Sequence, residues 1–240
     1  MFQTNFIFQT KKYMLSAATI FLLLVSMILT ACGGAGSVKK DTAQNDKPIE
    51  ITDVTGQTVT LKKPAERVVV QWSASGGAFM TMAALTGKDV ANIIVGIDPS
   101  LSKYRVDMWN HFKADLPELE KIPLIGAVNE KTFDTEKVIS LNPDVIFIPL
   151  YMKDQYESDV KPKIDAAGIP TIYIDHHAEK LENHQRSIEA IGKALGKEER
   201  AEELKKFYTE HVTRVTDRVN KINKPKPTVY IETGNEGPEG

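Results

Sequence analysis

Four short, continuously apolar runs constrain the fold of this chain more than any other feature. Strands that are apolar throughout, without alternation, are typical of sheets buried on both faces. Plausible helices lie between these runs, at 77–85, 135–141 and 154–167, and the last is followed by Gly168 and Pro170, as helix ends often are. The pattern predicts an α/β fold in which helices cover a parallel sheet. The apolar runs are residues 68–70, 93–95, 145–148 and 171–174.

Other patterns flank this predicted sheet. Residues 49–52 and 58–61 alternate in character around a turn and predict a β-hairpin. Further along, apolar residues spaced three or four apart predict a helix from 181 to 195, capped by Gly196. A longer helix is expected over 197–222, roughly 39 Å at 1.5 Å per residue. We expect a new strand at 228–231, and because nothing follows to bury its faces, we expect the sequence to be truncated.

The N-terminus has the pattern of a bacterial export signal. Two lysines precede an uncharged stretch, 14–31, that is 18 residues long and rich in Leu, Ile, Ala and Met. The sequence Leu-Thr-Ala-Cys at 29–32 resembles a lipobox, which implies removal of 1–31 as a signal peptide and lipidation of Cys32. The protein would then be anchored on the extracytoplasmic face of the cell membrane. The alternative is an uncleaved transmembrane helix, for which 18 residues are nearly long enough.

Cys32 is the only cysteine, so lipidation leaves no thiol for a disulfide, a zinc cluster or a nucleophile. Residues 32–47 are small and polar and predict a flexible tether. Loss of the two leader lysines changes the formal net charge from −2 to −4. This charge does not favour nucleic acid as a partner.

Several motifs, taken in order, resemble the lipoprotein substrate-binding proteins of bacterial ABC importers for ferric siderophores, haem and cobalamin. The resemblance covers about residues 48–234 and implies two α/β lobes joined by one long helix, with the ligand held between them. Residues 48–180 would form the first lobe, 181–224 helices including the inter-lobe helix, and 225–240 the start of a second lobe that is mostly missing. The motifs are the hairpin with PAERVV at 64–69, TEKVISLNPDVI at 135–146, GIPTIYID at 168–175 and IGKALG at 191–196.

This resemblance implies a receptor that captures an iron(III) chelate and delivers it to an ABC permease with its ATPase. No intrinsic cofactor is expected. The alternatives are a haem or cobalamin receptor of the same transporter class, or a cell-surface lipoprotein without a transport role. An enzyme is disfavoured, because the sequence has no free cysteine after lipidation, no Gly-x-Ser-x-Gly, no His-Glu-x-x-His and no obvious carboxylate dyad.

Parallel sheets bind ligands at the carboxyl ends of their strands, so the loops there are expected to carry the ligand contacts. These loops are residues 71–77, 97–109, 149–151 and 175–178. Trp72 could form one flat wall of a pocket, or simply pack at the lobe surface. Arg105 could pair with oxygens of an anionic chelate, or form an ordinary surface salt bridge. Trp109 and Tyr151 are aromatic candidates in neighbouring loops.

His176 is the fifth candidate for ligand contact. It and His177 are neighbours in an extended segment and should point to opposite sides, so one site could hardly use both. Direct ligation of iron is disfavoured because siderophore oxygens already saturate the ferric ion, and no protein metal site is predicted. The other histidines, at 111, 184 and 211, are expected to serve packing or lie at the surface.

Glu136 precedes the Leu-Asn-Pro-Asp sequence at 141–144. The resemblance implies that this glutamate lies on the outside of the first lobe and meets an arginine of the permease. The alternative is an ordinary carboxylate near a helix N-terminus, stabilised by the helix dipole.

Overall fold

The computed structural model describes residues 47–75, 77–178, 180–225 and 227–230 of the 240-residue chain. The predicted signal peptide (1–31), the lipidation site Cys32 and nearly all of the predicted tether lie outside the described residues. No helix within the described ranges is both long and apolar enough to cross a membrane.

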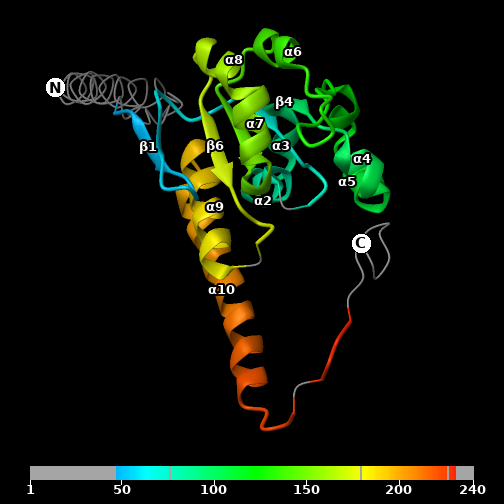
Figure 1. The fold of residues 1–240 in the computed structure, drawn as a ribbon, viewed down its shortest axis with the longest axis vertical. Coiled ribbons are helices and arrows are strands. Elements are labelled where there is room, and N and C mark those ends of the chain that lie inside the picture. The colour runs from blue at the N-terminus through cyan, green and yellow to red at the C-terminus, as the bar shows by residue number, and fades with distance from the viewer. Residues whose placement is uncertain (1–46, 76, 179, 226, 231–240) are drawn as a thin grey trace, which may run out of the picture. The chain divides into compact units, whose positions relative to one another are not determined.

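A four-stranded sheet lies at the centre of the lobe (Figure 1). All three neighbouring pairs are parallel, with Val69 opposite Ile146 and Phe147 opposite Ile172. Three of the strands are buried along their whole length, so the prediction of a parallel sheet covered on both faces is confirmed. In spatial order the strands are β4 (Ile94–Ile97), β3 (Val68–Val70), β5 (Val145–Pro149) and β6 (Thr171–Ile174).

Helices cover both faces of this sheet (Figure 1). Alternate strand residues point to opposite sides, so Val70 and Phe147 join one hydrophobic cluster while Val69 and Ile146 join the other. The first cluster is completed mainly by α2 (Ala78–Thr86), α3 (Val90–Ile93), α4 (Ser100–Tyr104), α5 (Val106–Asp115), η2 (Pro117–Lys121) and α9 (Leu181–Ala194). The second is completed mainly by α6 (Thr135–Ser140), η3 (Leu150–Met152), α7 (Lys153–Asp159) and α8 (Lys161–Ala166).

The helix predicted over 154–167 is two helices. The chain leaves α-helical geometry at Val160, which has φ −122° and separates α7 from α8. Pro162 lies in the first turn of α8. A proline has no backbone N–H and its ring clashes with the carbonyl four residues earlier, so it is tolerated at the start of a helix but not inside one.

The segment 97–109, expected to be a loop, is largely helical. Asp98 accepts a hydrogen bond from the backbone N–H of Ser100 (2.9 Å) at the start of α4. Leu101 is buried and Trp109 packs against the same hydrophobic cluster. This apolar burial stabilises α4 and α5 in a segment whose spacing carried only a weak helical signal.

The predicted hairpin is confirmed. β1 (Ile49–Thr52) pairs with β2 (Thr58–Leu61) in antiparallel register, with Ile51 opposite Val59. Ile51 and Leu61 are buried in the first cluster, which ties the hairpin to the lobe.

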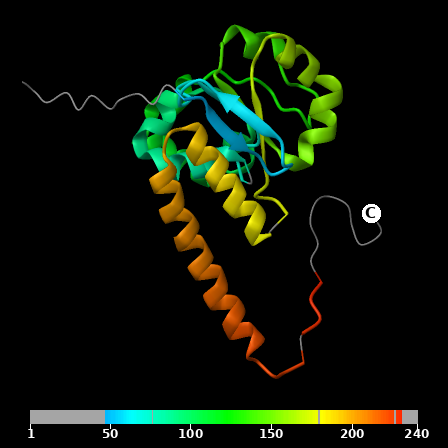
Figure 2. The same ribbon diagram turned by 90° about the vertical axis from the view of Figure 1, so that its left-hand side faces the viewer.

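The long C-terminal helix is confirmed as α10 (Glu198–Asn220), whose 23 residues give a length of about 34 Å. Residues 195–197 connect the two helices: α9 ends at Ala194 and α10 begins at Glu198. Gly196, at φ +61°, lies in this connection and stops α9 from continuing. Figure 2 shows α10 beginning beside α9 and continuing past the lobe. Its later turns expose apolar side chains, at Phe207, Val215 and Val219.

The strand expected at 228–231 is not formed over its described residues. Residues 227–230 have no regular secondary structure, and Val229 and Tyr230 are 68% and 69% exposed. A strand needs a neighbour for its backbone hydrogen bonds, and the described residues place none beside this segment.

Candidate functional site

All four parallel strands end at the same edge of the sheet, and one aromatic ring follows each of them. Tyr104 follows β4, Trp72 follows β3, Tyr151 follows β5 and His177 follows β6. This order is the spatial order of the strands. Neighbouring ring centroids are 5.9 Å apart for Tyr104 and Trp72, 6.1 Å for Trp72 and Tyr151, and 4.9 Å for Tyr151 and His177. We call these four residues the aromatic row.

The aromatic row is accessible from solvent. Tyr104 is 50% exposed and Tyr151 44% exposed, His177 is exposed, and Trp72 is half-buried. Aromatic rings present large apolar faces at little cost in side-chain entropy. The row therefore offers a surface for a bulky ligand with an apolar or conjugated exterior.

Trp72 is held in its place by a strained turn. Its φ of +53° is unusual for a residue other than glycine and costs on the order of 1 kcal/mol. The buried side chain of Gln71 supports the turn: its Nε2 donates to Gly126 O (3.0 Å) and its Oε1 accepts from Val128 N (2.9 Å). These buried hydrogen bonds offset the strain and fix the direction of the tryptophan.

Asp98 joins the loops after β3 and β4. Its carboxylate accepts hydrogen bonds from Ser73 N (2.6 Å) and from Ser100 N (2.9 Å), and Ala74 N donates to Ser100 Oγ (3.0 Å). Burial, and then the negative charge of Asp98, raise the pKa of Tyr151. Tyr151 is therefore a neutral phenol at ordinary pH, able to donate a hydrogen bond as well as to pack.

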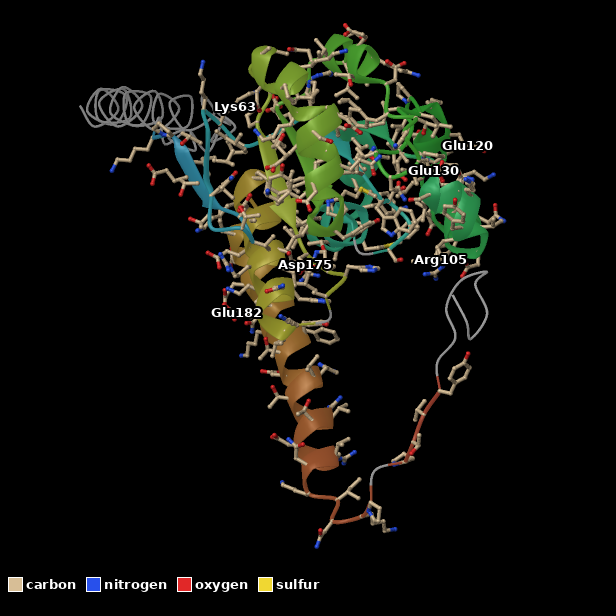
Figure 3. All side chains as sticks on the ribbon, in the orientation of Figure 1. Lys63, Arg105, Glu120, Glu130, Asp175 and Glu182 are labelled. Carbon is tan, nitrogen blue, oxygen red and sulfur yellow. The ribbon has the colours of Figure 1, made fainter. Side chains whose placement is uncertain are left out.

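Asp175 directly follows β6, at the lower end of that strand in Figure 3, and organises the loop that begins there. Burial alone would raise the pKa of this carboxyl, yet hydrogen bonds from Ala178 N, Asn183 Nδ2 and His177 N lower it overall. The carboxylate thereby fixes the backbone of His177, whose ring lies against Tyr151.

His176 points away from the aromatic row. Its Nε2 lies 3.3 Å from Thr81 Oγ1, and its ring packs edge-on against His184, which in turn stacks on Tyr208 of α10. These side chains border a separate cavity of about 260 Å³. Burial, and secondarily the nearby His184, lower the pKa of His176 to about 4, against a smaller opposing effect of Asp175. The expectation that the two neighbouring histidines point to opposite sides is confirmed.

The two remaining ligand candidates lie on or before α5. Arg105 lies between α4 and α5, at the lower edge of the lobe in Figure 3, and its Nε is 3.4 Å from Asp107 Oδ1. Trp109 packs into a different cavity, of about 210 Å³, with Leu101 and Leu119. The structure thus brings Trp72 and Tyr151 together, places Arg105 next to Tyr104 in the chain, and puts Trp109 and His176 elsewhere.

Tyr104 and His177 are members of the aromatic row that the sequence did not single out. Both lie in segments expected to carry ligand contacts, 97–109 and 175–178. The missing signal was the strand order, which brings the ends of β4 and β6 to the two sides of Trp72 and Tyr151.

Glu136 and the aromatic row lie at opposite edges of the sheet. It is in the first turn of α6, which leads into the amino end of β5, whereas the row follows the carboxyl ends of the strands. Figure 1 shows α6 and α8 at the upper edge of the lobe, opposite the point of the β6 arrow. The Glu136 side chain is 81% exposed, and its Oε1 lies 4.0 Å from Lys163 Nζ.

The sequence profile of the periplasmic binding protein family matches residues 84–238. The chain belongs to this family. It is 27% identical over 221 residues to the uncharacterized ABC transporter substrate-binding lipoprotein YvrC of Bacillus subtilis, covering 88% of this chain and 61% of the relative. It is 28% identical over 223 residues to the petrobactin-binding protein YclQ of the same organism, covering 90% of this chain and 62% of the relative.

Among solved structures, the TroA-like periplasmic binding protein FepB from Veillonella parvula is similar with a TM-score of 0.75 and 70% identity. That match covers 80% of this chain and 55% of the FepB chain. A periplasmic solute binding protein from the same species matches with a TM-score of 0.57 and 28% identity, over 75% of this chain and 51% of the other. The chain spans less than two thirds of the length of these relatives. The family match and the similar structures confirm the predicted family and fold class.

Proposed function

We propose that this protein is the substrate-binding lipoprotein of an ABC importer, which captures a ferric siderophore outside the membrane and delivers it to the permease. Family membership supports a binding role over an enzymatic one, and the name of YclQ records a siderophore as the ligand of one relative. The observation that carries the proposal is the aromatic row at the carboxyl edge of the sheet. Ligands bind at this edge in open α/β folds.

The chemistry of the row suits a chelate whose metal is already coordinated. A ferric siderophore saturates its iron with hard oxygen ligands and presents the organic part of the chelator to the protein. Ring faces from Tyr104, Trp72 and Tyr151 can pack against that exterior without a bond to the metal. The residues proposed to contact ligand are therefore the row and the adjacent Arg105, whereas Trp109 and His176 remain sequence-based predictions.

Haem is the second candidate. Tyr151 and His177 lie side by side in the row, with centroids 4.9 Å apart, and phenol and imidazole are both groups that ligate haem iron. Their exposure leaves both side chains accessible to a flat macrocycle.

Delivery requires an anchor and a docking contact. We propose that lipid on Cys32 holds the receptor at the extracytoplasmic face of the membrane, and that Glu136 contacts the permease. The exposure of Glu136 and its place at the amino edge of the sheet support a role separate from ligand binding.

The proposal is tested on the purified full-length protein by absorption and mass spectrometry of retained ligand, followed by titration. Because a lost aromatic contact costs about 0.5 to 1.5 kcal/mol beyond the area it buries, Trp72→Ala should weaken binding of a ferric siderophore about tenfold or more. Phe207→Ala, which removes an exposed ring from α10 outside the aromatic row, is the control and should bind as the wild type does. A porphyrin spectrum would replace the siderophore with haem, and unchanged affinity in Trp72→Ala would remove the row from the site.

A further inference from the structure

Two cations beside Tyr104 in the aromatic row, Lys103 and Arg105, are paired with carboxylates. Lys103 Nζ lies 2.9 Å from Glu130 Oε1, and the Tyr104 hydroxyl donates to the same oxygen at 2.8 Å. Hydrogen bonds from Lys103 and then Tyr104 lower the pKa of Glu130, so its negative charge is present at neutral pH. Arg105 is countered in the same way by Asp107, at 3.4 Å. Figure 3 shows Glu130 and Arg105 on the same side of the lobe.

Asp98 adds a further negative charge behind the row. It is 1% exposed and its carboxylate is held by the backbone N–H groups of Ser73 and Ser100. None of the ion pairs found among the described residues includes Asp98. Lys103 and Arg105 are thus each paired with a carboxylate, and Asp98 adds a negative charge that acts on Tyr151, so these two cations leave no excess of positive charge beside Tyr104.

We infer that the site takes a metal chelate without net negative charge, such as an iron(III) trihydroxamate, and discriminates against a polyanionic chelate such as an iron(III) tris-catecholate. The inference rests on the proposed function and concerns the charge of the ligand. To pair with Lys103 or Arg105, a polyanion would have to displace the carboxylate of Glu130 or Asp107. The displaced carboxylate would stay close to the ligand and repel it. An uncharged chelate gains the contacts with the aromatic rings and meets no such repulsion.

The size of the effect follows from Coulomb's law. In water, one unit charge about 9 Å from a trianion changes the binding constant about tenfold, and salt near 0.15 M reduces this to roughly twofold. Asp107→Asn removes one such charge and releases Arg105 from its partner. Asp107 is largely exposed, so the variant leaves the core of the lobe unchanged.

Glu66→Gln is the matched control. It makes the same change of one charge unit on an exposed side chain, but Glu66 precedes β3 and therefore lies at the opposite edge of the sheet from the row. Its partner Lys63 is seen at that upper edge in Figure 3.

The experiment titrates the full-length protein and both variants with a neutral iron(III) trihydroxamate and with a trianionic iron(III) tris-catecholate, at low and at physiological salt. We expect the wild type to bind the neutral complex at least about tenfold more tightly at low salt. Asp107→Asn should reduce this ratio of binding constants about tenfold at low salt and about twofold at physiological salt. Glu66→Gln should keep the wild-type preference. Tighter binding of the tris-catecholate by the wild type, or an unchanged preference in Asp107→Asn, would overturn the inference while leaving the proposed function in place. If neither complex binds, the inference fails, and the retained-ligand measurement described above decides the proposed function separately.

Discussion

His176 shows how one partly buried side chain couples the lobe to solution pH. Its ring lies between Thr81 of α2 and His184 of α9, beside Tyr208 of α10. Within the part of the chain that the structure describes, Asp175 is the carboxylate that acts on it. Burial and His184 lower its pKa from 6.5 to about 4. The neutral ring therefore links the loop after β6 to both C-terminal helices.

The sign of the pH effect follows from this lowered pKa. As pH falls below 6.5 the unfolded chain binds a proton at His176 before the folded chain does, so stability is lost between pH 6.5 and about 4. We expect His176→Gln to reduce the loss between pH 7 and pH 4.5 by on the order of 2 kcal/mol in urea unfolding. Thr81→Val keeps the imidazole and should lower stability without changing its pH dependence. The same pH dependence in His176→Gln and wild type would contradict this assignment.

Single residues were predictable where their neighbours in sequence determine their setting. Trp72 and Tyr151 follow apolar strands directly, and the structure places both rings in the aromatic row. Trp109 differs from them, because its segment is helical rather than the predicted loop, and α5 directs the ring toward the core. Tyr104 and His177 depend on which strands are neighbours, and that information is not contained in local patterns.

At the scale of elements, the pairing of α9 with α10 depends on one glycine. A Cβ added at Gly192 would clash with Cβ of Ala201, which is buried in α10, so the two helices approach more closely than any side chain at 192 permits. The nearby Gly196, at φ +61°, ends α9 and allows the chain to reverse. Close approach of the helices here determines the direction in which α10 leaves the lobe.

Gly192→Ala should therefore destabilise the protein although alanine favours helices. The gain in helix propensity is about 1 kcal/mol, whereas forcing apart a packed contact costs typically 1 to 3 kcal/mol, so we expect a net loss of about 1 kcal/mol. Lys193→Ala, at the next and more exposed position, should change stability by no more than about 0.5 kcal/mol. Urea unfolding measures the free energy of unfolding of both variants. A Gly192→Ala variant more stable than the wild type would show that α9 and α10 can move apart without loss of stability.

Most elements could be predicted because burial on two faces gives strands an unmistakable pattern. The exceptions have local causes. Pro162 divides α7 from α8, and α4 and α5 form where Asp98 and buried Leu101 outweigh a weak helical pattern. The strand expected at 228–231 depends on a partner strand, and sequence pattern alone cannot supply that partner.

For the molecule as a whole, the parallel sheet separates the two surfaces for which we propose ligand binding and permease docking. The aromatic row lies at the carboxyl edge of the sheet, and α6 with Glu136 lies at the amino edge. Strands that are buried along their length hold these edges apart as a rigid unit. A substitution at one edge should therefore leave the geometry of the other unchanged, which allows ligand binding and docking to be measured independently.

The Glu136 substitutions test this separation in whole cells. Glu136→Ala should lower uptake of the ferric ligand, and Glu136→Lys should lower it further, because a lysine facing an arginine of the permease adds repulsion to the loss of the ion pair. Ligand affinity of both purified variants should equal that of the wild type. The exposed side chain forms an ion pair with Lys163, at 4.0 Å, and this exposed pair is worth at most about 1 kcal/mol. Glu118→Lys, the same charge reversal on the exposed surface of η2, is the control and should leave uptake intact. Normal uptake by Glu136→Lys would exclude a docking role, and weakened ligand binding would mean that the two edges of the sheet are not independent.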